Sequence, residues 1–488
     1  MKKTVFTTLF LLSIFSCTND FVEPQNQSGY PDEIASIIGN KCSTAGCHNT
    51  QSRGLAGGLD FSTWDLMFDG GRNGTSIIPY SIDNSYMLYS VNTDTTLGPV
   101  LLPTMPYNQS PLSTSEYNTL VNWIANGAPN KDGFVKFSDN PQRRKIYICM
   151  QGCDKVAVMD AQTKVIMRYV DVGATAAIEA PHLVRVSPDG QYWYVVFIGG
   201  NVVQKFRATD DSFVSQVNIG TGDWNTIIFS PDGKTGFVSG TTIGLTTMLN
   251  LDNMTVKTSL TLDQPHGGFV SDDGKWLYLT AQIGNHINKV CIDSTNIDYL
   301  SITPIVLVPG QSVSNSNAQN PHEMTMSPDG TKYFVSCQGT AEVRVFDATT
   351  DTFITSIAIG TKPQEFAVST TKQKIFVTCT EDVLDPNRKG SVYIIDPTTF
   401  STQMLYTGYQ PHGIAVDDVQ GLVYVANLNY DTGGPAPHHV SACSGKNGYL
   451  TIIDMNTMQL WNKTLADGSS FQYKCELLPF PYFVSVRN

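Results

Sequence analysis

The stretch 321–337, PHEMTMSPDGTKYFVSC, decides the fold because it joins two strand-like runs through a tight turn. Apolar and polar residues alternate on both sides of Ser327-Pro-Asp-Gly330, which predicts two β-strands and a short connection. The same turn recurs as SPDG at 187–190, as SPDG at 230–233 and as SDDG at 271–274. Repetition of one strand–turn–strand unit along a chain indicates a repeat architecture.

The spacing of the repeats predicts a ring of seven blades. Two degenerate copies are anchored at Ser369 and Asp417, and a last strand-like run ends the chain. Equivalent residues of successive repeats lie between 41 and 70 residues apart, and a four-stranded propeller blade needs about 40 to 50 residues. The residue five places before each turn defines the series His182, Asn225, His266, His322, Gln364 and His412, which Tyr482 completes in the last copy.

The first and the last strand-like run of the repeat region each lack a partner strand. The run 145–149 has no inner strand before it, and the run 482–487 has no blade after it. We expect the C-terminal strand to complete the first blade, because this closes the ring without leaving a free sheet edge. The predicted fold is mainly β: a seven-bladed β-propeller over residues 142–488, preceded by a small α-helical domain.

The repeats resemble YVTN-type β-propellers, through Val335-Ser, Val377-Thr and Tyr424-Val-Ala-Asn427. More distantly they resemble the propellers of nitrous oxide reductase and of haem-bearing nitrite reductase. The resemblance covers about 345 residues, and it implies a fold rather than a chemistry. The Cys-rich copper domain and dense histidine set of nitrous oxide reductase are missing here, so we do not transfer its activity.

Composition agrees with a folded, β-rich protein and argues against binding of nucleic acid. Hydrophobic residues make up 41% of the chain and charged residues 15%, with 40 Gly and 25 Pro, which is typical of short strands and tight turns. The net charge of −12, with only 31 Lys and Arg, opposes contact with phosphates, which requires a basic face.

The N-terminus predicts export. Lys2 and Lys3 precede the apolar stretch 5–15, so residues 1–16 read as a signal peptide. Ser16-Cys17 resembles the end of a lipoprotein signal, which implies a lipid anchor on Cys17; an ordinary signal peptide is the alternative. The polar residues 18–30 are expected to tether the folded body. We expect a cell-envelope protein, either an outer-membrane or a periplasmic lipoprotein, in which thiols can oxidise.

A haem motif is indicated by Cys42-Ser-Thr-Ala-Gly-Cys47-His48. Covalent attachment of haem c needs two thiols, with a histidine directly after the second to reach the iron. The spacer is four residues, whereas the usual spacer is two. Taken alone, the motif is also compatible with a disulfide or with part of a zinc site.

A methionine downstream supplies the second axial ligand in this hypothesis. Met105 lies in LPTMP at 102–106, where two prolines stiffen the loop, and a thioether is the expected sixth ligand of an electron-transfer haem. Met67 and Met87 are rivals that we interpret as core residues. The run 112–116 and the apolar residues after it predict a capped amphipathic helix that stops at Gly127.

This order of motifs resembles the small cytochrome c domains of secreted planctomycete and Bacteroidetes proteins. The resemblance rests on Gly46-Cys47-His48, on the Met105-Pro106 loop and on the helix end from Trp123 to Ala128. It implies one covalently bound haem c in residues 31–130, held by Cys42 and Cys47 and ligated by His48 and Met105. Residues 131–141 are expected to be a linker.

Seven histidines outside the haem motif map to one face of the predicted ring. Those in inner strands and in connections on this face form a candidate site for a transition metal, a second haem or a substrate, to which Glu323 and Glu365 add carboxylates. The alternative is a structural ring of water-bridged side chains. The histidines proposed for a metal site at this rim are His182, His266, His322, His412, His438 and His439, and His286 accompanies them.

The remaining cysteines suggest one disulfide. Cys443 and Cys475 lie in insertions of adjacent blades and are predicted to pair, with Cys153 as a competitor for Cys475. Three further cysteines end second strands, where other blades carry small residues, and are predicted to be buried: Cys149, Cys337 and Cys379.

Two hypotheses of function follow from these patterns. The first is an exported, lipid-anchored haem protein that transfers electrons to or from a redox partner protein, with the propeller as docking or substrate surface; if the ring holds an active site, it is an oxidoreductase. The second is a surface-exposed binding or scaffold protein without catalysis. The substrate and the oligomeric state are left open.

Overall fold

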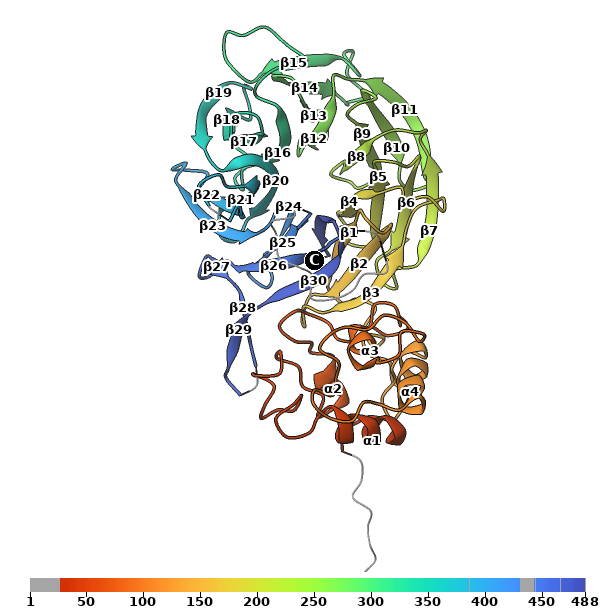
Figure 1. Cartoon of the computed structure of the whole chain (residues 1–488). Coiled ribbons are helices and arrows are strands. Elements are labelled where there is room, and N and C mark those ends of the chain that lie inside the picture. Colours follow the sequence, from red (N-terminus) through yellow and green to blue (C-terminus); the bar gives the residue numbers. More distant parts are fainter. Residues whose placement is uncertain (1–26, 386, 431–442, 444, 466, 488) are drawn as a thin grey trace, which may run out of the picture.

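The computed structural model describes residues 27–385, 387–430, 443, 445–465 and 467–487. Seven β-sheets surround a common axis, and an N-terminal region with a few helices lies beside the ring (Figure 1). The predicted seven-bladed β-propeller is therefore confirmed. No helix in the described part of the chain is long and apolar enough to cross a membrane.

The first blade contains both ends of the repeat region. Its order from the outside inward is β3 (Ile166–Asp171), β2 (Lys155–Asp160), β1 (Lys145–Met150) and β31 (Pro481–Val486). The C-terminal strand β31 pairs antiparallel with β1, with Ile148 opposite Val484. This confirms that the last strand closes the ring.

The next five blades follow the chain, from one inner strand to one outer strand. Each is a four-stranded antiparallel sheet. Their strands are β4 (Pro181–Val186), β5 (Tyr192–Phe197), β6 (Val202–Arg207) and β7 (Phe213–Asn218); β8 (Trp224–Phe229), β9 (Thr235–Gly240), β10 (Leu245–Asn250) and β11 (Thr255–Thr261); β12 (Pro265–Val270), β13 (Trp276–Ala281), β14 (His286–Cys291) and β15 (Ile302–Val306); β16 (Pro321–Met326), β17 (Lys332–Cys337), β18 (Glu342–Asp347) and β19 (Phe353–Ala358); and β20 (Thr361–Ser369), β21 (Lys374–Glu381), β22 (Gly390–Ile395) and β23 (Thr402–Gly408).

The seventh blade is enlarged, as its long repeat indicates. Strand β26 pairs with β25 on one side and with both β27 and β30 on the other. A small hairpin, β28 with β29, projects from this blade. The strands are β24 (Pro411–Asp417), β25 (Leu422–Asn427), β26 (Asn447–Asp454), β27 (Gln459–Leu460), β28 (Asn462–Thr464), β29 (Ser470–Gln472) and β30 (Lys474–Pro479).

The Ser-Pro-Asp-Gly turns are held by their own side chains. In the fourth repeat of this turn, Ser327 Oγ donates to Asp329 Oδ1 over 2.6 Å, and the Gly330 amide donates to the Ser327 carbonyl over 2.9 Å. Gly330 has a φ of +69°, a conformation that a residue without Cβ adopts freely. The turn residues thus fix the hairpin between the inner and second strands of a blade.

The N-terminal region is only partly helical. It contains α1 (Asp32–Lys41), α2 (Trp64–Met67), α3 (Tyr86–Val91) and α4 (Thr114–Ala125), with irregular backbone between them. Helix α4 begins with the predicted capping box, in which Ser113 Oγ accepts from the Glu116 amide and Glu116 Oε2 accepts from the Ser113 amide. Helices α1 and α4 contact each other.

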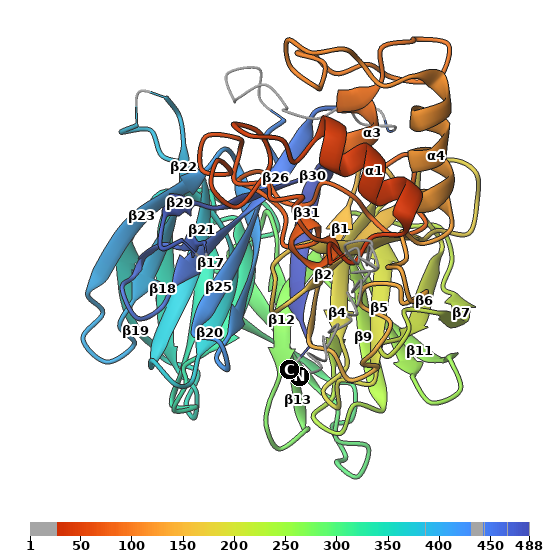
Figure 2. The ribbon, with the colours of Figure 1, turned by 90° about the horizontal axis from the view of Figure 1, so that it is seen from below.

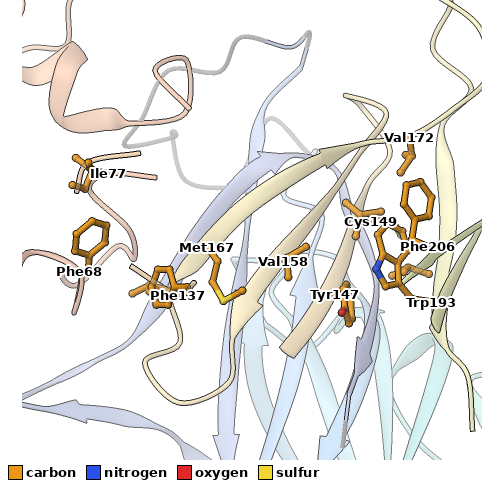
Figure 3. Packing of buried hydrophobic residues seen from close by; sticks show 14 of the residues in the cluster. Phe68, Ile77, Phe137, Tyr147, Cys149, Val158, Met167, Val172, Trp193 and Phe206 are labelled. Atoms are coloured by element: carbon orange, nitrogen blue, oxygen red, sulfur yellow. The ribbon is translucent and has the colours of Figure 1, made fainter. Parts of the chain in front are cut away.

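The N-terminal region packs directly on the propeller (Figures 1 and 2). Its backbone meets the seventh blade, where the Glu476 amide donates to the Asn73 carbonyl over 3.0 Å. Thr75 Oγ1 accepts from the Ile166 amide of β3 over 2.7 Å. A single apolar cluster continues from one part into the other, from Phe68, Ile77 and Phe137 through Met167 and Val158 to Tyr147, Trp193 and Phe206 (Figure 3).

We expect ring closure to control stability. Val484 in β31 is 1% exposed, so a Val484→Asp substitution buries an unpaired charge and should lower the free energy of unfolding by about 3 kcal/mol or more. The matched control Val419→Asp places the same charge at a residue that is 73% exposed, and it should change stability little. Thermal unfolding followed by circular dichroism measures both. Equal stability of the two variants would contradict the closing role of β31.

Candidate functional site

Side chains from the inner strands of different blades meet around the ring axis. Four rings of the predicted series are close: the His266 and His322 centroids lie 4.1 Å apart, and those of His322 and His412 lie 5.6 Å apart. The His182 centroid lies 6.4 Å from that of His266 and 6.3 Å from that of His412. Tyr482 packs on His182 and His412, at 4.2 and 3.9 Å between centroids. We call these five residues the inner-ring cluster.

The other rim histidines are not part of this cluster. His286, the first residue of β14, is buried and lies beside Asp263, with 3.6 Å between His286 Nε2 and Asp263 Oδ2. His438 and His439 lie outside the described residues. The structure thus brings together four of the six histidines proposed for a metal site, and metal binding by them stays a prediction.

A repeated backbone feature places these side chains. In six blades a residue with positive φ comes directly before the proline that opens the ring-facing part of the inner strand, with φ between +43° and +58°. This conformation costs an L-residue roughly 1–2 kcal/mol. These positive φ angles were not predicted, although the pattern Xaa-Pro-His marks such positions in the sequence. The residues concerned are Ala180, Gln264, Asn320, Lys362, Gln410 and Phe480.

Two of the four imidazoles have their Nδ1 atoms occupied. His182 Nδ1 lies 2.7 Å from Gln151 Nε2, so it accepts a hydrogen bond from that amide. His266 Nδ1 lies 3.1 Å from the His322 carbonyl oxygen, to which it donates. These contacts fix the orientation of both rings.

The remaining two imidazoles carry buried nitrogens without a hydrogen-bond partner in the described part of the chain. They are Nδ1 of His322 and both ring nitrogens of His412, although the Tyr482 backbone is close enough to His412 to raise its pKa against the effect of burial. His322 Nδ1 lies 3.7 Å from Glu365 Oε1. Burial lowers the pKa of His412 to about 3 and that of His322 well below its usual value, so both rings are neutral at pH 7 and keep a lone pair.

Two buried carboxyl groups lie next to these rings. Burial raises the pKa of Glu323 and of Glu365, and the nearby charge of Glu323 raises that of Glu365 further. Two adjacent carboxyls in a dry site share a proton, which forms a hydrogen bond between them. Gly267 leaves room for Glu323, because a Cβ at Gly267 would lie 2.5 Å from the Glu323 carboxyl carbon.

One buried cation accompanies the two carboxyl groups. Arg185 donates through Nη1 to the Ile227 carbonyl over 2.7 Å, and its guanidinium lies over the Phe483 ring. Burial lowers the pKa of Arg185, and the charges of Glu323 and Glu365 act against that effect. The inner ring therefore brings imidazoles, carboxyl groups and a guanidinium together near the axis of the propeller.

The predicted haem motif forms a compact loop after α1. The His48 amide donates to the Cys42 carbonyl over 3.1 Å, and the Cys47 amide donates to the Thr44 carbonyl over 3.0 Å. Cys42 and Cys47 are both free thiols. Burial raises the pKa of Cys42 to about 12, and the charge of Cys47 raises it further.

The three candidate methionines differ in their surroundings. Met67 in α2 and Met87 in α3 are 1% and 5% exposed, as expected for core residues. Met105 is partly buried and packs against the same apolar cluster as Cys42. Its amide donates to the Ser90 carbonyl over 2.7 Å, which holds the loop. Cys17 lies outside the described residues.

The predicted disulfide between Cys443 and Cys475 is wrong. Cys443 pairs with Cys153 instead, across 5.4 Å between Cα atoms. Cys475 is buried in β30, where it faces Gly74 of the N-terminal region and leaves no path to Cys443. The sequence placed Cys153 nearby, but it could not show that the side chain of Cys475 points toward a packed domain. Burial of Cys149, Cys337 and Cys379 is confirmed, each being 0% exposed.

Neither a comparison with known protein families nor one with curated protein sequences gives a match. Among solved structures, a protein from Bacteroides uniformis provisionally assigned as a 6-phosphogluconolactonase is similar at a TM-score of 0.53 and 13% identity, covering 71% of this chain and 99% of that one. A functionally unknown protein from Desulfotomaculum acetoxidans has a TM-score of 0.49 at 10% identity, covering 69% and 99%. Kuenenia stuttgartiensis hydrazine synthase has 0.46 at 18% identity, covering 59% and 79%.

These likenesses concern the fold alone. The chain is a seven-bladed β-propeller protein with an N-terminal region packed on its first and last blades. Its activity has to be argued from its own side chains.

The corrected disulfide can be tested directly. Peptide mapping without reduction should recover Cys153 linked to Cys443, while Cys475 reacts with an alkylating reagent only after unfolding. The double variant Cys153→Ser, Cys443→Ser should lose about 2–4 kcal/mol of stability, because the bond closes a long loop. Recovery of a peptide in which Cys475 is linked to Cys443 would restore the sequence prediction.

Proposed function

We propose that this protein is an exported c-type haem protein that transfers single electrons, with the propeller as the surface on which a redox partner or substrate docks. The observation that carries the proposal is the loop 42–48, in which two neighbouring free thiols precede a histidine. Elsewhere in the same chain Cys153 and Cys443 are oxidised to a disulfide. A free thiol pair beside a histidine is the arrangement that covalent haem attachment requires.

The residues around His48 fit a ligand role. Nδ1 of His48 is buried without a close hydrogen-bond partner among the described residues, and the Ala56 backbone acts on the same ring to raise its pKa against the effect of burial. Burial lowers the pKa of His48, so the ring is neutral at pH 7 and can coordinate a metal. The Phe61 ring lies 5.0 Å from the imidazole, and the Phe61 amide donates to the His48 carbonyl over 2.8 Å.

The backbone of the loop is held by side chains next to it. Asn49 Nδ2 donates to the Thr44 carbonyl over 2.6 Å, and Ser52 Oγ donates to the Cys47 carbonyl over 2.6 Å. These contacts orient the carbonyls inside the loop. They support a preorganised position for Cys42, Cys47 and His48, which reduces the entropy lost when a rigid group is bound.

Met105 is the residue that we propose for the second axial position. Its side chain is partly buried against an apolar cluster that runs through the N-terminal region, and its amide is held by the Ser90 carbonyl. His48 and Met105 would hold the iron of haem c, and Cys42 and Cys47 would bind its porphyrin covalently; the group would supply a one-electron couple.

The disulfide also supports the proposed location. A bond between Cys153 and Cys443 forms in oxidising compartments, in agreement with the signal peptide expected in residues 1–16. We further propose the lipid anchor on Cys17, a place in the periplasm or at the outer membrane, and membership of the YVTN-type propellers. An oxidoreductase activity would require the inner-ring cluster to bind a substrate.

Loss of the thiols should abolish covalent attachment. Protein produced together with cytochrome maturation factors should carry one haem that resists extraction with acidified acetone, and Cys42→Ser, Cys47→Ser should lose it. Cys291→Ser, which changes a buried thiol of the propeller, should keep the haem. A colourless wild-type protein would favour the competing hypothesis of a binding or scaffold protein.

The identity of the sixth ligand can be tested by spectroscopy. Met105→Ala should remove the far-red methionine-to-iron charge-transfer band and raise the affinity of the ferric iron for cyanide or imidazole, because one axial position becomes open. Met67→Ala and Met87→Ala should keep the band, although both are expected to lower stability by about 2–5 kcal/mol. An unchanged spectrum in Met105→Ala would transfer the role to one of these two residues.

A further inference from the structure

The inner-ring cluster contains a feature that haem binding does not use. Most polar side chains of this ring bond to a neighbour: Gln364 Nε2 donates to Thr380 Oγ1 over 2.7 Å, and the Asn225 amide donates to Thr241 Oγ1. His182 and His266 each use Nδ1 in a hydrogen bond. Nδ1 of His322 and a ring nitrogen of His412 have no such partner among the described residues, and each of His322, His412 and Glu365 places one candidate ligand atom within 4.8 Å of the other two.

We propose that His322, His412 and Glu365 bind one divalent first-row transition-metal ion at the axis of the propeller. Their candidate ligand atoms all lie within 4.8 Å of one another, and all three residues are buried. Two imidazoles and a carboxylate are ligands that zinc, copper, iron and nickel accept, whereas magnesium and calcium prefer oxygen.

The geometry requires only small side-chain movements. Ligand atoms that bind one ion at about 2.1 Å lie at most about 4.2 Å apart. The present separation of up to 4.8 Å closes by rotation about side-chain bonds. The inner strands β16, β20 and β24 that carry the three ligands are neighbours in the ring and keep their positions.

The surroundings supply what such a site needs beyond its ligands. Glu323 lies against Glu365, and the two carboxyl groups share a hydrogen bond, the kind of contact that orients a metal ligand. Tyr482 packs against the ring of His412, at 3.9 Å between centroids. Arg185 is tied to the Ile227 carbonyl, and it offsets the second carboxylate. One ligand carboxylate and two neutral rings favour a divalent cation.

Zinc binding by the purified full chain tests the proposal. After treatment with a chelator and dialysis, the wild-type protein should take up one equivalent of Zn²⁺ in a competition assay with a chromogenic chelator. At a hundredfold excess over the dissociation constant, Zn²⁺ should raise the unfolding temperature by roughly 3 °C.

Substitutions by glutamine distinguish the three proposed metal ligands from other residues of the ring. Gln364 occupies the equivalent ring position in another blade, so His322→Gln and His412→Gln introduce a residue that this ring already accommodates. Together with Glu365→Gln, they should weaken Zn²⁺ binding about 100-fold or more, since even outer-sphere partners contribute 10- to 100-fold. Asn225→Gln is the matched control and should bind Zn²⁺ within about threefold of wild type, because Asn225 is not one of the proposed ligands and its amide already donates to Thr241 Oγ1.

The outcomes are distinct from those for haem. Retention of one Zn²⁺ in all three ligand variants, or no binding tighter than about 10 μM by wild type, would overturn the proposal. If a histidine variant does not fold, the change in unfolding temperature that Zn²⁺ causes in Glu365→Gln still tests the proposal. Cys42→Ser, Cys47→Ser should bind Zn²⁺ as tightly as wild type, so loss of haem leaves this result unaffected.

Discussion

The pairing of β31 with β1 is the interaction on which the rest of the structure depends. It joins residues more than 300 positions apart, and it converts an open row of sheets into a ring without free inner edges. The same strand brings Tyr482 into contact with His182 and His412, which come from strands at opposite ends of the repeat region. The strand pairing that closes the ring thus also completes the inner-ring cluster.

The closed ring also explains how polar side chains are kept near its axis. The second strands of the blades are almost entirely buried, as in β1 and β25, so the sheets hold together through apolar contacts between their faces. The inner strands start with residues that project toward the axis, where they contact one another and the backbone of neighbouring inner strands. A buried nitrogen without a hydrogen-bond partner at such a place lowers the stability of the fold unless a ligand binds it.

Periodicity in the sequence predicted the propeller well because each blade is a local unit with its own turn signature. Ser-Pro-Asp-Gly turns, alternation along strands and the spacing of the repeats are all encoded within about 50 residues. The convergence of His182, His266, His322 and His412 also followed, because equivalent positions in a closed ring must face one axis. What the sequence could not show is long-range packing. The place of Cys475 against Gly74 depends on how the N-terminal region docks on the seventh blade, and no local pattern records this contact.

The cysteines of the described chain divide by environment, and this division bears on the haem proposal. Cys149, Cys337 and Cys379 are sealed inside second strands, and burial raises the pKa of each thiol, so they stay protonated and unreactive. Cys153 and Cys443 lie in connections outside the sheets and are joined. Cys42 and Cys47 belong to neither group: they are neighbours in an irregular loop, Cys47 is partly exposed, and yet both are free. These two thiols and the histidine that follows them are the groups that the proposed attachment of haem c would use.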